Sequence, residues 1–115
     1  MAYAFNDDKS KVDLADVFAS DYAYTNKEYS VNAGSVKAIR FYCPVNEIIV
    51  QINAIQFYIG NNAWAGSDKL EIVKMIWENN HIEVVVKNVT NSTVTVIQST
   101  TGVESTFARV LVIRK

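Results

Sequence analysis

Side chains able to act as an acid, base or nucleophile are few in this sequence. His81 is the one histidine and sits in the polar run 79–81, without a second histidine for a metal or a clear serine or cysteine partner. Cys43 is the one cysteine and lies in the apolar run 39–45, where a small buried hydrophobe is expected. A single cysteine also excludes an internal disulfide and a cysteine metal cluster. The sequence therefore predicts no nucleophilic chemistry.

Carboxylates and glycines do not form a recognisable catalytic pattern either. The glutamates in the second half of the chain are scattered: Glu71, Glu78, Glu83 and Glu104. No two of them stand out as the pair that a glycosidase holds about 5–10 Å apart. The four glycines lack the spacing of a phosphate-binding loop, and the acidic N-terminal residues match no calcium loop. We therefore predict that the protein is not an enzyme and has no cofactor and no metal site.

Aromatic side chains are the remaining candidates for a binding site. Trp64 lies in the longest predicted loop, and Tyr58 is expected to point outward just before it. Polar residues of the same loop surround the tryptophan: Asn61, Asn62 and Asp68. Flat rings stack on sugar faces while amides and carboxylates bond the hydroxyls, so these five residues are a predicted glycan site. In the alternative interpretation, Trp64 covers the end of the core or fills a subunit interface. Three more tyrosines cluster before the first clear strand: Tyr22, Tyr24 and Tyr29.

The triplets at 88–90 and 91–93 have the form of N-glycosylation acceptors. The N-terminus lacks the charged and then apolar pattern of a signal peptide. Asn, Ser and Thr also favour turns, because their side chains bond nearby backbone groups. We predict that both triplets are turn residues.

The stretch 48–59 is the strongest strand signal and the predicted centre of the fold. One apolar set, expected on the inward face, alternates first with Ile49, Gln51 and Asn53: Ile48, Val50, Ile52 and Ala54. A second set follows out of phase: Ile55, Phe57 and Ile59. Period-two alternation predicts a strand, and the slip at Ala54 and Ile55 predicts a β-bulge. We expect one long, bent, central strand.

Further strands follow the same alternation, with turn residues between them. They are predicted within 29–33, 39–43, 70–77, 82–86, 94–96 and 107–114. The strand at 70–77 also contains a slip, from Leu70 and Ile72 to Val73, Met75 and Trp77. Six or seven antiparallel strands with little helix predict an all-β sandwich or jelly roll.

The predicted domain organisation is an N-terminal arm over residues 1–25 followed by one β-sandwich domain over 26–115. The arm alternates weakly as short extended strands do, but Ser10 and Asp13 also fit the start of a helical turn. A length of 115 residues fits one domain with a real core.

The last strand, 107–114, carries apolar residues on both faces. Ala108, Val110 and Val112 form one face, and Phe107, Leu111 and Ile113 form the other. Either a loop or the N-terminal arm covers the second face, or another subunit does. The second interpretation makes Phe107, Leu111 and Ile113 a predicted interface of a homo-oligomer.

Charge and hydropathy limit the partners. A net charge of −1 gives no electrostatic footprint for nucleic acid or an anionic membrane. No stretch approaches the roughly 20 apolar residues of a membrane span, so we expect no membrane insertion. These features predict a protein made in the cytoplasm.

Four segments resemble small structural proteins of phages and prophages of Gram-positive bacteria. The opening MAYAFNDDKSKVDL resembles their N-termini, and three later segments are similar to β-sandwich modules of tail-fibre, baseplate and head-fibre proteins: YSVNAGSVKAIRFYCP, VVVKNVTNSTVTV and RVLVIRK. The resemblance covers most of the chain and transfers no binding residue by position. It implies a virion structural or host-attachment protein that is usually oligomeric and often trimeric.

Two functions from different classes follow. The first is a non-enzymatic virion protein, made in the host cytoplasm, that self-assembles and contacts a cell-surface glycan. Its N-terminal arm, Tyr3–Asp21, would bind other virion proteins. The alternative is a stand-alone, monomeric carbohydrate-binding module that uses Trp64 and nearby tyrosines as its platform.

Overall fold

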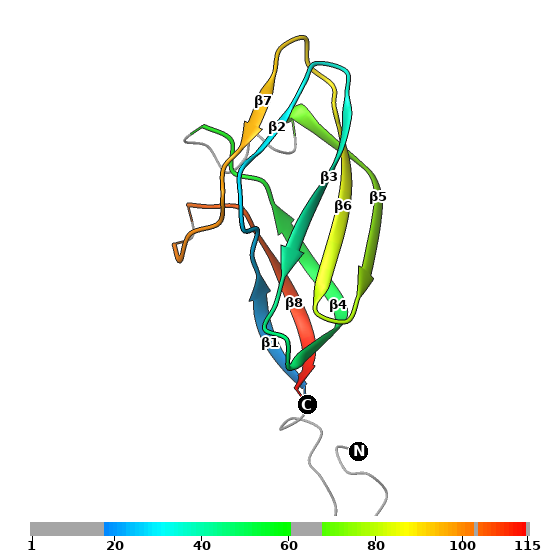
Figure 1. The fold of residues 1–115 in the computed structure, drawn as a ribbon, viewed down its shortest axis with the longest axis vertical. Helices are drawn as coiled ribbons and strands as arrows, with labels where there is room; N and C mark the ends of the chain where they lie inside the picture. Colours follow the sequence, from blue (N-terminus) through cyan, green and yellow to red (C-terminus); the bar gives the residue numbers. More distant parts are fainter. Residues whose placement is uncertain (1–17, 61–67, 103, 115) are drawn as a thin grey trace, which may run out of the picture.

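Antiparallel strands make up nearly all of the computed structural model, which describes residues 18–60, 68–102 and 104–114 (Figure 1). Eight strands lie in these ranges: β1 (Phe18–Ala23), β2 (Tyr29–Val31), β3 (Val36–Tyr42), β4 (Glu47–Gln56), β5 (Leu70–Glu78), β6 (His81–Asn88), β7 (Val94–Val96) and β8 (Phe107–Arg114). Asp68 and Lys69 form a helical turn before β5. The predicted all-β, sandwich-like fold is confirmed, with one strand more than predicted. No helix of the described part is long and apolar enough to cross a membrane.

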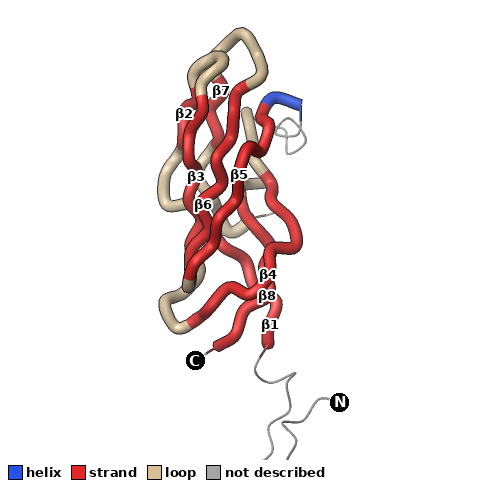
Figure 2. Tube along the Cα trace, turned by 90° about the vertical axis from the view of Figure 1, so that its right-hand side faces the viewer, coloured by secondary structure: helices blue, strands red, loops and turns tan. Residues whose placement is uncertain are grey.

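Two three-stranded sheets, of order β1-β8-β4 and β3-β6-β5, form the layers of the sandwich (Figure 2). A smaller β2-β7 pair lies at the end far from the C-terminus, and the described part is elongated, 62 × 26 × 22 Å (Figure 1). Buried residues from all three sheets form one core, including Val31, Phe41, Val84, Val96 and Val110. Alternation along each strand places these side chains on inward faces.

The strand β4 differs from its sequence prediction in two respects. It lies at the edge of its sheet, and the central strand is β8. Its pairing with β8 shifts twice, between Ile49 and Gln51 and between Ile52 and Ala54. The predicted bulge is therefore confirmed, but a second one precedes it.

The two bulges change which β4 side chains face the core. The isoleucines opposite the buried β8 residues are Ile49, Ile52 and Ile55. They recur every third residue, because each bulge inserts one unpaired residue. The predicted inward set of Ile48, Val50 and Ala54 is wrong for this reason.

The N-terminal boundary of the domain is earlier than predicted. Phe18–Ala23 forms β1 and pairs along its whole length with β8, from Phe18 opposite Ile113 to Ala23 opposite Ala108. Ala23 is buried in the core. The sandwich therefore begins no later than Phe18, whereas Ser10 and Asp13, on which the helical alternative rests, belong to the part of the arm that is not described. Residues 1–17 lie outside the described residues.

The strand β5 confirms its predicted slip, but almost all of its apolar side chains are exposed. Its register against β6 shifts between Ile72 and Lys74, which leaves Val73 as the bulge residue. Leu70 is buried, but every residue from Glu71 to Glu78 is exposed. An apolar pattern marks a strand, but it does not specify whether another layer covers it.

Candidate functional site

A shallow groove runs along β1 and the loop that enters β8. Three neighbouring pockets of about 160, 110 and 210 Å³ make it up. The first and second share Tyr22, and the second and third share Tyr24 and Thr101. Each is smaller than the roughly 300 Å³ at which enclosed ligand sites begin, so the groove suits a ligand that lies along the surface. We call it the tyrosine groove. Its walls are Tyr22, Tyr24, Phe107 and the loop residues Ser99, Thr100, Thr101 and Gly102, with a polar end at Ser20, Asp21, Asn53 and Arg109.

Two exposed tyrosines dominate the tyrosine groove. The side chains of Tyr22 and Tyr24 are 44% and 40% exposed, and their rings stack with centroids 6.3 Å apart at an angle of 24°. The rings of Phe107 and Tyr22 make a T-shaped contact with their centroids 5.4 Å apart, which holds the Tyr22 ring in place. The two rings therefore form a nearly parallel, partly exposed aromatic pair at the surface.

The strand β1 and the end of β3 set the positions of these rings. Tyr22 is opposite Arg109 in the β1–β8 pair, on the face away from the core. Tyr24 follows β1 and exchanges two backbone hydrogen bonds with Tyr42, at 2.9 and 2.8 Å. Both tyrosine backbones are thus fixed by sheet pairing, so the ring spacing does not depend on a loop.

A network of hydroxyl groups holds the loop that forms the other wall. The Thr25 amide donates to Ser99 Oγ at 2.8 Å, and the Ser99 amide donates to Thr25 Oγ1 at 2.9 Å. The Ser99 hydroxyl also donates to the Thr106 carbonyl. These reciprocal bonds join the segment after β1 to the loop before β8, which keeps Thr100 and Thr101 beside Tyr24.

Two buried hydroxyl residues extend this network under the loop. Ser105 Oγ donates to the Gly102 carbonyl at 3.0 Å, and the Tyr58 amide donates to Thr106 Oγ1 at 3.0 Å. Both Ser105 and Thr106 are fully buried. A buried polar group is stable only when hydrogen-bonded, so these bonds order the groove wall.

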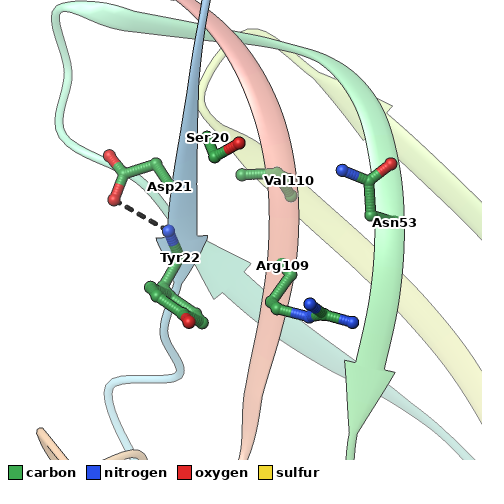
Figure 3. Close-up of a pocket in the computed structure, with 6 residues that line it drawn as sticks. All are labelled: Ser20, Asp21, Tyr22, Asn53, Arg109 and Val110. Atoms are coloured by element: carbon green, nitrogen blue, oxygen red, sulfur yellow. Dashed lines mark hydrogen bonds between the residues drawn. The ribbon is translucent and has the colours of Figure 1, made fainter.

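The polar end of the groove spans three adjacent strands (Figure 3). Arg109 on β8 lies between Tyr22 on β1 and Asn53 on β4. Asn53 is the unpaired residue of the second β4 bulge, and it is exposed. Asp21 Oδ1 accepts a hydrogen bond from the Tyr22 amide at 2.7 Å. A cation and an amide thus border the aromatic surface and offer donors and an acceptor to a polar ligand, whereas the Asp21 carboxylate points to the other side of β1 (Figure 3).

A buried acid lies behind this end of the groove. Glu47 is 4% exposed, and its Oε2 accepts a hydrogen bond from Arg114 Nε at 3.1 Å. Burial raises the pKa of Glu47, the nearby Asp21 carboxylate raises it further, and Arg114 lowers it. Within the described part of the chain, Oε1 is buried without a hydrogen-bond partner. The ionised form of Glu47 is therefore poorly satisfied, and a proton on Oε1 could be donated toward Asp21.

The buried thiol of Cys43 adjoins the same acid. Burial, followed by the charges of Glu47 and Asp21, raises the pKa of Cys43 to about 12. A thiol with such a pKa stays protonated at neutral pH and is a poor nucleophile. The prediction that Cys43 is a buried hydrophobe is confirmed.

Asp21 and Glu47 are the carboxyl pair that the sequence did not single out. Glu47 was expected in a turn, but it begins β4 and points inward. Its 4% exposure leaves no room for a substrate between the two carboxyls. Among the described residues, no group of three or more His, Cys, Asp or Glu is arranged to hold a metal ion.

The predicted glycan site around Trp64 is only partly described. Trp64, Asn61 and Asn62 lie outside the described residues. Asp68 is exposed in the helical turn before β5. Tyr58 is 7% exposed, so the expectation that its ring points outward is wrong. Phe57 and Ile59 are buried as well, so both sides of the chain are covered after β4 ends at Gln56. The Tyr58 amide donates to Thr106 Oγ1 and its carbonyl accepts from the Ile97 amide, which places this segment between two others.

The predicted interface residues lie together on the outer face of β8. Phe107, Leu111 and Ile113 alternate there with the buried inner residues, and all three are half-buried. Phe18 and Ile48 flank Ile113 on either side, which forms an apolar strip at the end of the sheet that carries the C-terminus. The strip remains a predicted interface.

Only part of the tyrosine groove can be recognised in the sequence. The cluster of Tyr22 and Tyr24 was visible, but the wall residues come from distant segments of the chain. Thr101 and Arg109 reach the groove through the β1–β8 pairing, which joins residues about 90 positions apart. No local spacing could reveal that contact.

No protein-family model, curated protein or solved structure matches the chain.

Proposed function

We propose that this chain is a non-enzymatic structural and attachment protein of a phage virion, and that its tyrosine groove contacts a glycan on the host surface. The observation that carries the glycan contact is the pair of exposed, nearly parallel rings of Tyr22 and Tyr24. The virion assignment rests on the resemblance of the chain to phage β-sandwich modules.

The chemistry of the groove favours a sugar over a wholly apolar ligand. The ring hydrogens of a sugar are electropositive and attract the face of a tyrosine, and sugar hydroxyls need hydrogen-bond partners. Thr100 and Thr101 border the rings on one side, and Asn53 and Arg109 border them on the other. A glycan lying along the groove would meet apolar surface in the middle and polar groups at both ends.

Assembly into a particle uses other surfaces in this proposal. The outer strip of β8 with Leu111 and Ile113 is the proposed contact of a homo-oligomer, with a trimer favoured. Other virion proteins would bind the N-terminal arm. Because Phe18–Ala23 is already paired in β1, the part available to such partners is residues 1–17. Light scattering of the purified protein tests the trimer directly.

The glycan contact is tested by titrating the labelled protein with polysaccharide fragments from Gram-positive cell walls and recording NMR chemical shifts. Tyr22→Ala and Tyr24→Ala should each weaken binding by about ten-fold, since each removes one stacking surface. Tyr42→Ala is the matched control, because Tyr42 is similarly exposed at 38% but lines none of the three pockets. It should leave binding unchanged.

Two outcomes contradict this assignment of the site. Equal losses in all three tyrosine variants would mean that the effect is general instability. Binding that survives Tyr22→Ala and Tyr24→Ala but is lost in Trp64→Ala would move the site to the loop before β5. In a monomeric protein, that second result would favour the stand-alone carbohydrate-binding module.

A further inference from the structure

The strand β5 exposes an unusual amount of apolar surface. Its large apolar side chains are between 39% and 55% exposed: Ile72, Val73, Met75, Ile76 and Trp77. It is also the edge of the sheet β3-β6-β5, and no described strand pairs with its outer side. An uncovered apolar edge strand is a template for pairing with another chain.

The inner face of β5 extends beyond the opposing sheet. Trp77, Met75 and Ile72 are opposite Ile82, Val84 and Val86 of β6, which are fully buried. The β5 residues therefore point to the same side as the core but remain exposed. Figure 1 shows β5 as the outermost strand of its layer. Both the open edge of β5 and its inner apolar face, which extends beyond the opposing sheet, are therefore exposed.

We infer that a second copy of this chain pairs with β5, strand against antiparallel strand, about a two-fold axis through Ile76. The two three-stranded sheets would then form one continuous sheet across the dimer. This inference does not depend on glycan binding, and it concerns a surface separate from the tyrosine groove and from the outer strip of β8.

The charges on β5 select this register. After the bulge at Val73, the strand is regular from Lys74 to Glu78, and Ile76 is the centre of that segment. An axis at Ile76 places Lys74 of each copy opposite Glu78 of the other. Opposite charges in directly facing positions stabilise a strand pair, and the two-fold axis makes this contact twice.

The apolar residues fit the same register. Met75 of one copy is opposite Trp77 of the other on the inner face, where sulfur and aromatic ring attract each other. Ile76 is opposite its own copy on the outer face. The overhanging inner face is therefore covered by the matching face of the partner.

Backbone geometry is compatible with this pairing. The β5–β6 hairpin closes through the two-residue turn of Asn79 and Asn80. A two-residue turn ends on a hydrogen-bonded pair, and such pairs alternate along the ladder. Met75 and Trp77 therefore direct their backbone groups to the open edge. In the proposed register these two residues face each other across the dimer and can exchange both bonds.

Other registers about a two-fold axis are less favourable. An axis at Lys74 brings the two lysines together, and like charges in facing positions repel. An axis at Met75 or Trp77 leaves Lys74 and Glu78 without opposite partners. The regular segment is short, so the dimer belongs to the weak class of interfaces below about 1,200 Å² and should dissociate on dilution.

Sedimentation equilibrium over a wide range of protein concentration tests the pairing without any glycan. Met75→Pro should abolish it, because proline removes an N–H that points to the open edge and leaves the β6 ladder intact. If the outer strip of β8 also assembles the protein, Met75→Pro should halve the mass of the larger assembly. The circular dichroism spectrum and melting temperature check that each variant is folded.

Charge reversal tests the register itself. Lys74→Glu and Glu78→Lys should each weaken the association by about ten-fold, since each places like charges together at two sites. The double variant should restore it. Glu71→Lys is the matched control on the same strand, before the bulge, and should have no effect. A wild-type mass that Met75→Pro does not change would overturn the inference, as would a double variant no better than the single ones.

Discussion

Asn88 offers the sharpest test of how this fold is stabilised. Its side chain is completely buried at the end of β6 and makes four hydrogen bonds. Nδ2 donates to the carbonyls of Val31 and Ser92, both at 2.8 Å. Oδ1 accepts from the Thr90 amide at 2.9 Å and from the Thr90 hydroxyl at 2.7 Å. One amide thus joins β6, β2 and the turn before β7. The replacement Asn88→Ala removes all four hydrogen bonds.

The expected loss of unfolding free energy depends on how deeply the hydrogen-bond partners of Asn88 are buried. The bond to Val31 is fully buried, and a buried carbonyl left unpaired costs about 1–3 kcal/mol. The other three bonds are partly buried, so water can replace them and each contributes less, about 0.5 kcal/mol. Asn88→Ala should therefore reduce the free energy of unfolding by about 3 kcal/mol. Small domains have about 5–15 kcal/mol in total, so the variant should fold but melt early.

Urea denaturation followed by tryptophan fluorescence measures this difference. Asn91→Ala is the control, because Asn91 is exposed in the same turn. It should change the free energy of unfolding by less than about 0.5 kcal/mol. A loss below about 1 kcal/mol for Asn88→Ala, or equal losses for both variants, would refute the reasoning. The same geometry predicts that Asn88 is not a glycosylation acceptor, because its amide nitrogen is occupied.

Two further predictions concern the buried groups near β4. The raised pKa of Glu47 means that the folded state binds its proton more tightly than the unfolded state, so its contribution to stability is present at low pH and is lost as the pH rises above about 4.5. Glu47→Gln should therefore gain stability relative to wild type over that window in melting curves at several pH values, and a constant difference would contradict it. Cys43, with a pKa of about 12, should not react with a thiol reagent at pH 8 until urea unfolds the protein. Rapid labelling of the folded protein would show that the thiol is accessible.

Local pattern was sufficient to predict the fold class. Alternating residues in β3, β6 and β8 identified strands and their inward faces, because one face of each strand is covered by the core. Gly34, in the turn between β2 and β3, adopts a φ of +73° that favours glycine.

It was harder to predict which side chains of a strand point inward and whether another layer covers them. Two bulges in β4 turned Ile49, Ile52 and Ile55 inward, and their positions depend on pairing with β8, which is far away in the sequence. The exposure of Met75 and Trp77 depends on how far the opposing sheet reaches. Neither quantity is encoded in the local alternation of apolar and polar residues.

The same distinction between local sequence signals and long-range pairing applies to the candidate site. The sequence showed the cluster of Tyr22 and Tyr24, since the two residues are only two positions apart in the chain. It did not show that Thr101 and Arg109 join them, because the long-range pairing of β1 with β8 brings these residues together. The polar residue Asn53 enters the groove only through a bulge.

The antiparallel pairing of Phe18 with Ile113 has a mechanical consequence. Both residues lie at one end of the molecule, and the turn at Gly34 lies at the other (Figure 1). A force pulling Phe18 away from Ile113 would peel β1 from β8 one residue pair at a time, so that each hydrogen bond bears the load alone. A force between Phe18 and the far turn would pull along β1 and β2 themselves, which lead directly from one point to the other, so the covalent backbone would carry the load and the β1–β8 ladder would not be peeled (Figure 1). The protein should therefore resist tension along its long axis far better than tension that pulls Phe18 away from Ile113.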